Sequence, residues 1–226
     1  MKHIVVILIC FLVPIGLLTL LMRKKSSVWI SFLIGVLAFV ISQIILRIPL
    51  LQFLQGKLSV QFFAIRQPIL WILLLALSAG IFEEIARYIG FLCIRKHHQS
   101  LFDALAFGLG HGGIEAMLLV GIPLLHASIP VQEIGIAMLE RCFAMLAHVM
   151  MSIIVWYGVK EKKFIYVMIA IFVHMGLDCY PLLGNNIWLI EGYVMGYAIL
   201  LSVLCYRCII KKVLKHEISA DRTICE

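Results

Sequence analysis

Residues 67–93 read QPILWILLLALSAGIFEEIARYIGFLC, an apolar run that carries two adjacent carboxylates and an arginine. A run of about 20 apolar residues is long enough to cross a bilayer as a helix. Glu83, Glu84 and Arg87 are unfavourable in hydrocarbon, where each charge costs about 3 kcal/mol, and such residues usually face other helices. The stretch therefore predicts a transmembrane helix that turns these three side chains toward the interior of a bundle.

The same apolar character extends over the whole chain of 226 residues, which is 63% hydrophobic and 14% charged, with a mean hydropathy of +1.08. The period-2 alternation of a membrane β-barrel is absent. We therefore predict an all-α, polytopic membrane bundle in which residues 1–226 form a single transmembrane domain. Seven spans are predicted, at residues 3–22, 28–46, 67–93, 101–124, 133–157, 163–180 and 187–208. Residues 47–66 are expected to form an amphipathic piece at the membrane interface.

The net charge of +7 does not indicate a nucleic-acid partner, because the basic residues gather in short loops and the tail. Their distribution instead indicates how the chain is oriented in the membrane. One set of alternating loops, with the tail, carries 13 lysines and arginines, among them Arg95, Lys96 and Arg222, whereas the other set carries 4. Because positive loops stay in the cytoplasm, the N-terminus is predicted outside and the C-terminus in the cytoplasm. That orientation requires an odd number of spans.

Away from the loops and span ends, ten ionisable side chains stand out as candidates: Glu83, Glu84, Arg87, His111, Glu115, Glu140, Arg141, His148, His174 and Asp178. Four of them, on four successive spans, are 11–15 residues from the nearest cytoplasmic basic residue: Glu83, His111, His148 and His174. At 1.5 Å per residue these four lie at a similar depth, roughly 16–23 Å from the inner boundary. A common depth predicts one buried polar site assembled from four helices.

The spacing of neighbouring polar residues predicts their contacts along each helix. Arg87 is four residues after Glu83 and three after Glu84, so it can lie beside either carboxylate. We expect it to restrain Glu84, although the spacing leaves open which glutamate faces the cavity. Asp178 is four residues after His174 and is expected to accept a hydrogen bond from its imidazole, fixing the tautomer.

Small residues accompany these polar positions, as in AGIFEEIARYIG (79–90) and FGLGHGGIEA (107–116). Glycine lets helix backbones approach closely, which a site built from several helices requires. Gly110 and Gly112, on either side of His111, are also expected to loosen that helix.

Three histidines and a carboxylate are the ingredients of a catalytic zinc site. We predict His111, His148 and His174 as metal ligands, Zn²⁺ as the cofactor, and Glu83 as the group that takes a proton from water. A single histidine in a membrane span more often bonds to a neighbouring helix, but three at matched depth with a glutamate favour a shared site.

The remaining ionisable residues are less informative. Glu140 and Arg141 lie near the outer face and are interpreted as structural or cavity-lining residues. For Glu115 a structural role and a role in the site are equally compatible with its position.

Three short motifs occur in order on separate helices: EEIAR (83–87), FGLGH (107–111) and HMGLD (174–178). They resemble the CAAX-protease and bacteriocin-processing superfamily of intramembrane endopeptidases, whose motifs are E-E-x-x-x-R, F-x-x-x-H and H-x-x-x-N. Within it, the chain looks like the bacterial YhfC branch of intramembrane metalloproteases. The resemblance covers residues 67–180, which would be the catalytic core.

This resemblance implies roles for the matching residues. Glu83 would activate the attacking water, and Glu84 and Arg87 would shape the site. His111 and His174 would be metal ligands or would stabilise the transition state. The resemblance is compatible with a zinc-assisted mechanism and with a metal-free Glu/His mechanism.

The chain departs from the superfamily pattern at two positions. Arg87 comes one residue early, which turns it by about 100° on the helix. Asp178 takes the place of the asparagine and adds a negative charge that favours a bound cation. His148 belongs to none of the motifs and is included from its depth.

The function predicted from these observations is hydrolysis of a peptide bond in a membrane-embedded or membrane-associated substrate, at the bacterial cytoplasmic membrane. One alternative is a non-catalytic membrane scaffold, against which the retained pair Glu83 and Glu84 argues. The other alternative is a transporter. A transporter would have broken helices in two related halves of the chain, and the sequence shows no such repeat. No HExxH, G-x-G-D or G-x-S-x-G motif of another protease class occurs.

Overall fold

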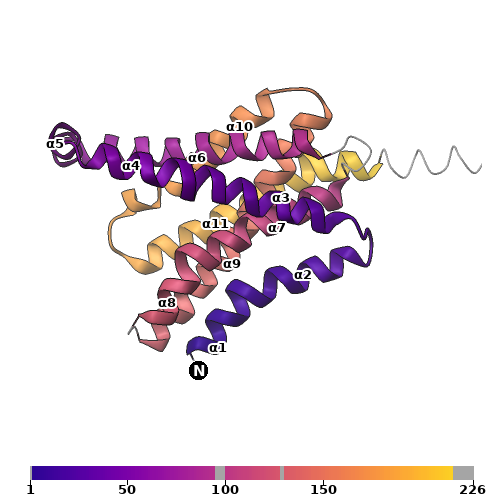
Figure 1. The fold of residues 1–226 in the computed structure, drawn as a ribbon, viewed down its shortest axis with the longest axis horizontal. Coiled ribbons are helices and arrows are strands. Elements are labelled where there is room, and N and C mark those ends of the chain that lie inside the picture. Colours follow the sequence, from indigo (N-terminus) through magenta and orange to yellow (C-terminus); the bar gives the residue numbers. More distant parts are fainter. Residues whose placement is uncertain (1, 95–99, 128–129, 216–226) are drawn as a thin grey trace, which may run out of the picture.

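The computed structural model describes residues 2–94, 100–127 and 130–215. Within these ranges the chain forms helices and turns and no strand, and seven helices are long and apolar enough to cross a membrane (Figure 1). The predicted all-α membrane bundle and its seven spans are thereby confirmed. Arg95, Lys96 and Arg222, which entered the orientation argument, lie outside the described residues.

The first three spans come from the N-terminal half. The first comprises α1 (Lys2–Ile7), η1 (Leu8–Leu12) and α2 (Val13–Met22), and the second comprises α3 (Val28–Phe39), η2 (Val40–Arg47) and α4 (Ile48–Gln55). A short helix, α5 (Leu58–Arg66), precedes the third span, α6 (Pro68–Cys93).

Four more spans follow. The fourth comprises α7 (Leu101–Glu115), η4 (Ala116–Gly121) and α8 (Ile122–His126), and the fifth is α9 (Val131–Lys160). The sixth comprises α10 (Ile165–Asp178) and the 3₁₀ turn η5 (Tyr180–Leu183), and the seventh comprises α11 (Ile187–Cys205) and η6 (Tyr206–Ile210).

Prolines account for three of the four widened, π-helical segments among the described residues, η6 being the exception. Segments η1, η2 and η4 each come directly before a helix that has a proline in its first two positions, namely Pro14, Pro49 and Pro123. Proline lacks an N–H and crowds the carbonyl four residues earlier, and a wider turn relieves that conflict without ending the helix. The second span therefore continues to Gln55, and the predicted end at residue 46 is wrong.

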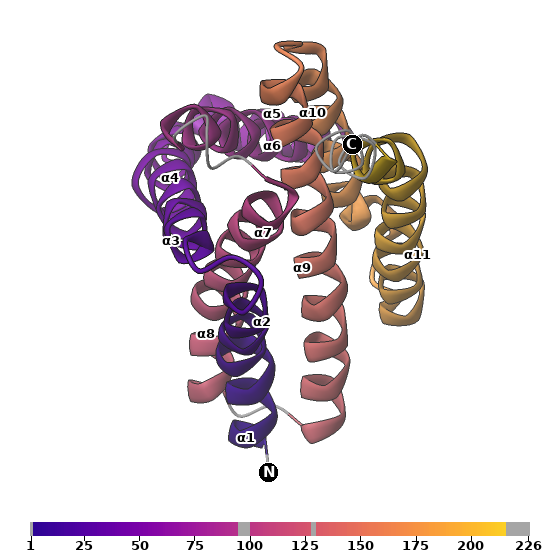
Figure 2. The same ribbon diagram turned by 90° about the vertical axis from the view of Figure 1, so that its right-hand side faces the viewer.

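The distribution of side chains is that of a protein solvated by lipid. Large apolar residues such as Trp188 (71% exposed) and Phe172 (59%) point outward. Helix α9 lies in the interior, where it packs against α6, α7, α10 and α11 (Figure 2). Trp156 of α9 is fully buried, and charged side chains such as Glu84 and Arg87 are buried in the interior of the bundle as well. Apolar surface of this extent is covered by lipid or by other protein, so the chain is an integral membrane protein.

Glycines set the helix crossings that shape the interior. A Cβ atom on Gly110 of α7 would lie 2.1 Å from the backbone oxygen of Phe32 in α3, and one on Gly80 of α6 would lie 2.6 Å from that of Ile171 in α10. The predicted close approach of backbones is confirmed. Helix α7, however, stays regular through its glycines to Glu115 and widens only in η4, so the expected loosening at His111 is wrong.

Candidate active site

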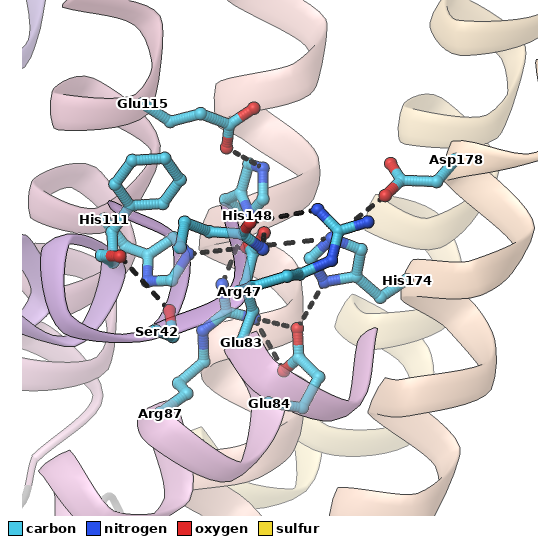
Figure 3. Close-up of polar contacts among 12 residues, drawn as sticks. Ser42, Arg47, Glu83, Glu84, Arg87, His111, Glu115, His148, His174 and Asp178 are labelled. Carbon is cyan, nitrogen blue, oxygen red and sulfur yellow. Dashed lines mark hydrogen bonds and ion pairs between the residues drawn. The ribbon is translucent and has the colours of Figure 1, made fainter. Parts of the chain in front are cut away.

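Six polar residues from four spans meet in the interior of the bundle (Figure 3). We call them the polar cluster: Glu83, Glu84 and Arg87 on α6, His111 on α7, His148 on α9 and His174 on α10. Each is at most 4% exposed. The prediction that the four residues at matched depth come together is confirmed.

Glu84 links the arginine of the cluster to one of its histidines. Arg87 Nη1 donates to both oxygens of Glu84 at 2.6 Å, so the predicted restraint of Glu84 by Arg87 is confirmed. The Nδ1 atom of His174 lies 2.7 Å from Glu84 Oε1. Arg87 Nη2 also lies 3.2 Å from His148 Nδ1. Charge-assisted contacts of this kind fix the ring of His174 in one orientation.

Glu83 is the glutamate that faces the histidines. Its Oε2 atom lies 2.8 Å from His111 Nε2, 3.7 Å from His174 Nε2 and 3.9 Å from His148 Nδ1. The other ring nitrogen of His111 has no hydrogen-bond partner among the described residues, and the ring stands edge-on to Phe39. One carboxylate oxygen is therefore surrounded by three imidazoles.

Asp178 does not make the contact predicted for it. Its Oδ2 atom is 3.7 Å from His174 Nε2, which is too long for a hydrogen bond, and its side chain is 34% exposed. Glu84, on the neighbouring helix, bonds to the opposite ring nitrogen instead. Asp178 is thus the most exposed carboxylate at the site, next to the nitrogen that faces Glu83.

Glu115 and Arg141 extend the cluster along α7 and α9. Glu115 Oε2 lies 2.5 Å from His148 Nε2, and Glu115 Oε1 accepts from Arg141 Nη1 at 3.2 Å. Arg141 also pairs with Glu140. The interpretation of Glu140 and Arg141 as structural or cavity-lining residues near the outer face did not include the connection of Arg141 to His148 through Glu115.

Gln43 and Arg47 of η2 also reach the site, and neither was predicted to do so from the sequence. Gln43 Nε2 donates to Glu83 Oε1 at 2.5 Å, and Arg47 Nη1 donates to Gln43 Oε1 at 3.0 Å. The predicted core at 67–180 leaves out this part of the second span. The available signal was a glutamine within an apolar span, followed four residues later by an arginine.

Three donor atoms of the cluster lie close enough together to hold a metal ion. Ligand atoms of Glu83, His148 and His174 all lie within 4.8 Å of one another, and the three residues are buried. With bonds of about 2.0–2.1 Å, the ligand atoms of a tetrahedral zinc ion are about 3.4 Å apart. The distances of 3.7 and 3.9 Å from Glu83 Oε2 are close to this value. His111 stands outside the group and contacts its carboxylate.

A family model described as "YhfC intramembrane metalloprotease" matches residues 9–129 and 122–201. The chain belongs to this family. A relative from Bacillus subtilis (strain 168), "Uncharacterized membrane protein YhfC", is 28% identical, and the comparison covers 74% of this chain and 77% of that protein. No solved structure is significantly similar.

The residues matched by the YhfC model include the polar cluster as well as Gln43, Arg47, Glu115 and Arg141. The buried Glu83, His148 and His174 can hold a metal ion, which agrees with the description of the family.

Proposed function

We propose that the chain is an intramembrane endopeptidase that hydrolyses a peptide bond in or beside the membrane, with Glu83 at the centre of its site. One observation carries the proposal: a buried carboxylate oxygen faces three imidazoles from three other helices. A structural ion pair needs only one partner for each charge. Here three imidazole nitrogens surround a single oxygen atom of Glu83. The description of the YhfC family supports the same chemistry.

The metal we propose is Zn²⁺, held by Glu83, His148 and His174, because two imidazoles and one carboxylate are a known ligand set of catalytic zinc. When bound, the ion would polarise the scissile carbonyl and make water more acidic. This set replaces the three histidines of the sequence prediction, and His111 instead holds Glu83 by its contact with Oε2.

The other residues of the site orient these groups. Glu84 fixes His174, and Arg87 in turn fixes Glu84. Among the carboxylates of the site, Asp178 has the largest exposed fraction, so it is best placed to exchange protons with incoming water. In a metal-free site Glu83 itself would accept the proton from water, as the superfamily resemblance implies.

The substrate is proposed to be a membrane-embedded or membrane-associated peptide, because the cluster lies within the spans. We propose the bacterial cytoplasmic membrane as the location, with the N-terminus outside and the C-terminus in the cytoplasm, on the loop charges.

The test compares membrane-protein N-termini, by mass spectrometry, in cells that express the wild type, Glu83→Gln or His174→Ala. Matched controls are Glu133→Gln, an exposed glutamate in the first turn of α9, and His126→Ala, an exposed histidine at the end of α8. New N-termini are expected with the wild type and both controls, and they should be lost in both site variants. Cleavage that persists in both site variants at normal protein levels contradicts the proposal.

Elemental analysis of the purified protein tests the metal. About one zinc per chain is expected for the wild type and for His126→Ala, and much less for His148→Ala. If the wild type contains no stoichiometric metal and chelators leave cleavage unchanged, the zinc assignment is wrong and the metal-free mechanism remains.

A further inference from the structure

The second span bears two polar residues that serve neither as metal donors nor as lipid-facing groups. Gln43 is 3% exposed, and Arg47 is half-buried. Both lie in η2, and widened turns of this kind recur at functional sites. Because a buried amide in a membrane needs hydrogen-bond partners, the partners of Gln43 and Arg47 indicate what these residues do.

Arg47 is fixed by the helix that carries Glu83. Its Nη2 atom donates to the backbone oxygen of Leu75 at 2.7 Å, and its Nε atom donates to Ser78 Oγ at 3.0 Å. Leu75 and Ser78 lie on α6, one to two turns before Glu83. The planar guanidinium makes these bonds in a rigid fork, so Arg47 is held in one position relative to α6.

Arg47 also determines which way the amide of Gln43 points. A guanidinium has only donors, so the amide atom that faces Arg47 Nη1 at 3.0 Å must be the oxygen. The NH₂ group is then directed to Glu83 Oε1, at 2.5 Å. Gln43 therefore acts as a donor to Glu83 because Arg47 occupies its acceptor.

The two oxygens of Glu83 are thereby given different partners. Oε1 is held by Gln43, and Oε2 faces His111, His148 and His174. The terminal torsion of a glutamate is broad, so a carboxylate without such a bond samples many orientations. Holding Oε1 fixes the direction in which Oε2 points.

The other two donors of the candidate metal group are supported in the same manner. His174 is held by Glu84, which Arg87 holds in turn. His148 contacts Glu115, which pairs with Arg141. In each case a donor is oriented by a second side chain, which is itself oriented by an arginine.

We propose that Gln43 and Arg47 are positioning residues for Glu83, which turn its Oε2 atom toward the histidines. The consequence for metal binding and hydrolysis rests on the proposed function. Among the described residues, Arg47 contacts Glu83 only by way of Gln43. That dependence separates Arg47 from a residue that merely stabilises the packing of η2 on α6.

The test measures zinc affinity, by competition with a chromophoric chelator, in Gln43→Met, Arg47→Met and the double variant. Loss of a residue that orients a metal ligand typically weakens metal binding about 10- to 100-fold, and this loss is expected for Gln43→Met. The double variant should bind zinc no more weakly than Gln43→Met alone. The matched control is Ser42→Ala, because Ser42 is buried beside Gln43 and, within the described part of the chain, its hydroxyl bonds only to the backbone oxygen of Phe39. Wild-type affinity in Gln43→Met, or losses that multiply in the double variant, would overturn the proposal.

A second measurement separates this proposal from the proposed function. If the wild type binds no zinc and cleaves nothing, the proposed function fails, but the contact between Gln43 and Glu83 is still tested by thermal unfolding. The melting-point shifts of Gln43→Met and Glu83→Met are expected to be non-additive in the double variant, because each change removes one partner of the same hydrogen bond. Additive shifts show that Gln43 does not hold Glu83, and the positioning role is then wrong.

Discussion

Replacement of Glu84 by glutamine removes one negative charge from the polar cluster and keeps the size of the side chain. Arg87, which is fully buried, would lose the carboxylate that receives two hydrogen bonds from its Nη1 atom. Breaking a buried ion pair by removing one partner costs about 3–5 kcal/mol. Because glutamine keeps one acceptor oxygen, we expect the lower end of this range, about 3 kcal/mol, or roughly a 150-fold change in the ratio of folded to unfolded protein.

The assay is equilibrium unfolding in mixed detergent micelles, followed by far-ultraviolet circular dichroism. The double variant Glu84→Gln/Arg87→Met removes the arginine charge together with its partner. It is therefore expected to be more stable, by about 2 kcal/mol or more, than the sum of the two single changes predicts. The exposed Glu133→Gln serves as the control, with an expected change within about 0.5 kcal/mol.

Two results would refute this reasoning. A change of less than about 0.5 kcal/mol in Glu84→Gln would mean that Arg87 does not depend on Glu84 for its charge compensation. Strict additivity in the double variant would mean that the two residues contribute independently, which is incompatible with a shared buried ion pair.

Two further changes test the packing and the charge of the site. Gly110→Ala places a Cβ atom 2.1 Å from the backbone oxygen of Phe32 and should cost about 1–3 kcal/mol in unfolding experiments. Gly16→Ala, whose Cβ atom would meet nothing within 4 Å, should not destabilise, and equal losses in the two variants would count against the helix crossing. Asp178→Asn removes a charge 3.7 Å from His174 Nε2 and should weaken zinc binding about fivefold or more, since two unit charges about 4 Å apart interact by about 1 kcal/mol even in bulk water. Unchanged affinity in a chelator competition would place Asp178 outside the ion's environment.

The depth of the site was predictable because every residue of a transmembrane helix advances by the same rise. Counting from the basic loops placed Glu83, His111, His148 and His174 in one layer, and the contacts among them confirm it. The restraint of Glu84 by Arg87 was predictable for a similar reason, since it is a contact within one helix.

Contacts between helices were not predictable, because sequence spacing does not give the rotation of one helix against another. The i,i+4 rule gave Asp178 as the partner of His174, but Glu84 of the adjacent helix lies closer to its other nitrogen. Arg47 was counted among loop charges. The π-helical turn before Pro49 carries the helix onward, and α6 then supplies acceptors for the arginine.

The charges of the site provide an independent argument for a divalent cation. Five carboxylates and three guanidiniums are connected through the contacts described: Glu83, Glu84, Glu115, Glu140 and Asp178 with Arg47, Arg87 and Arg141. With neutral imidazoles, this network has a net charge of −2, and each imidazole that takes up a proton offsets one of these charges. An uncompensated double charge is unfavourable inside a membrane protein, where water is largely excluded. A divalent cation among Glu83, His148 and His174 would neutralise it. Arg141 compensates Glu115, whereas Arg87 compensates Glu84 and also lies 3.2 Å from His148 Nδ1.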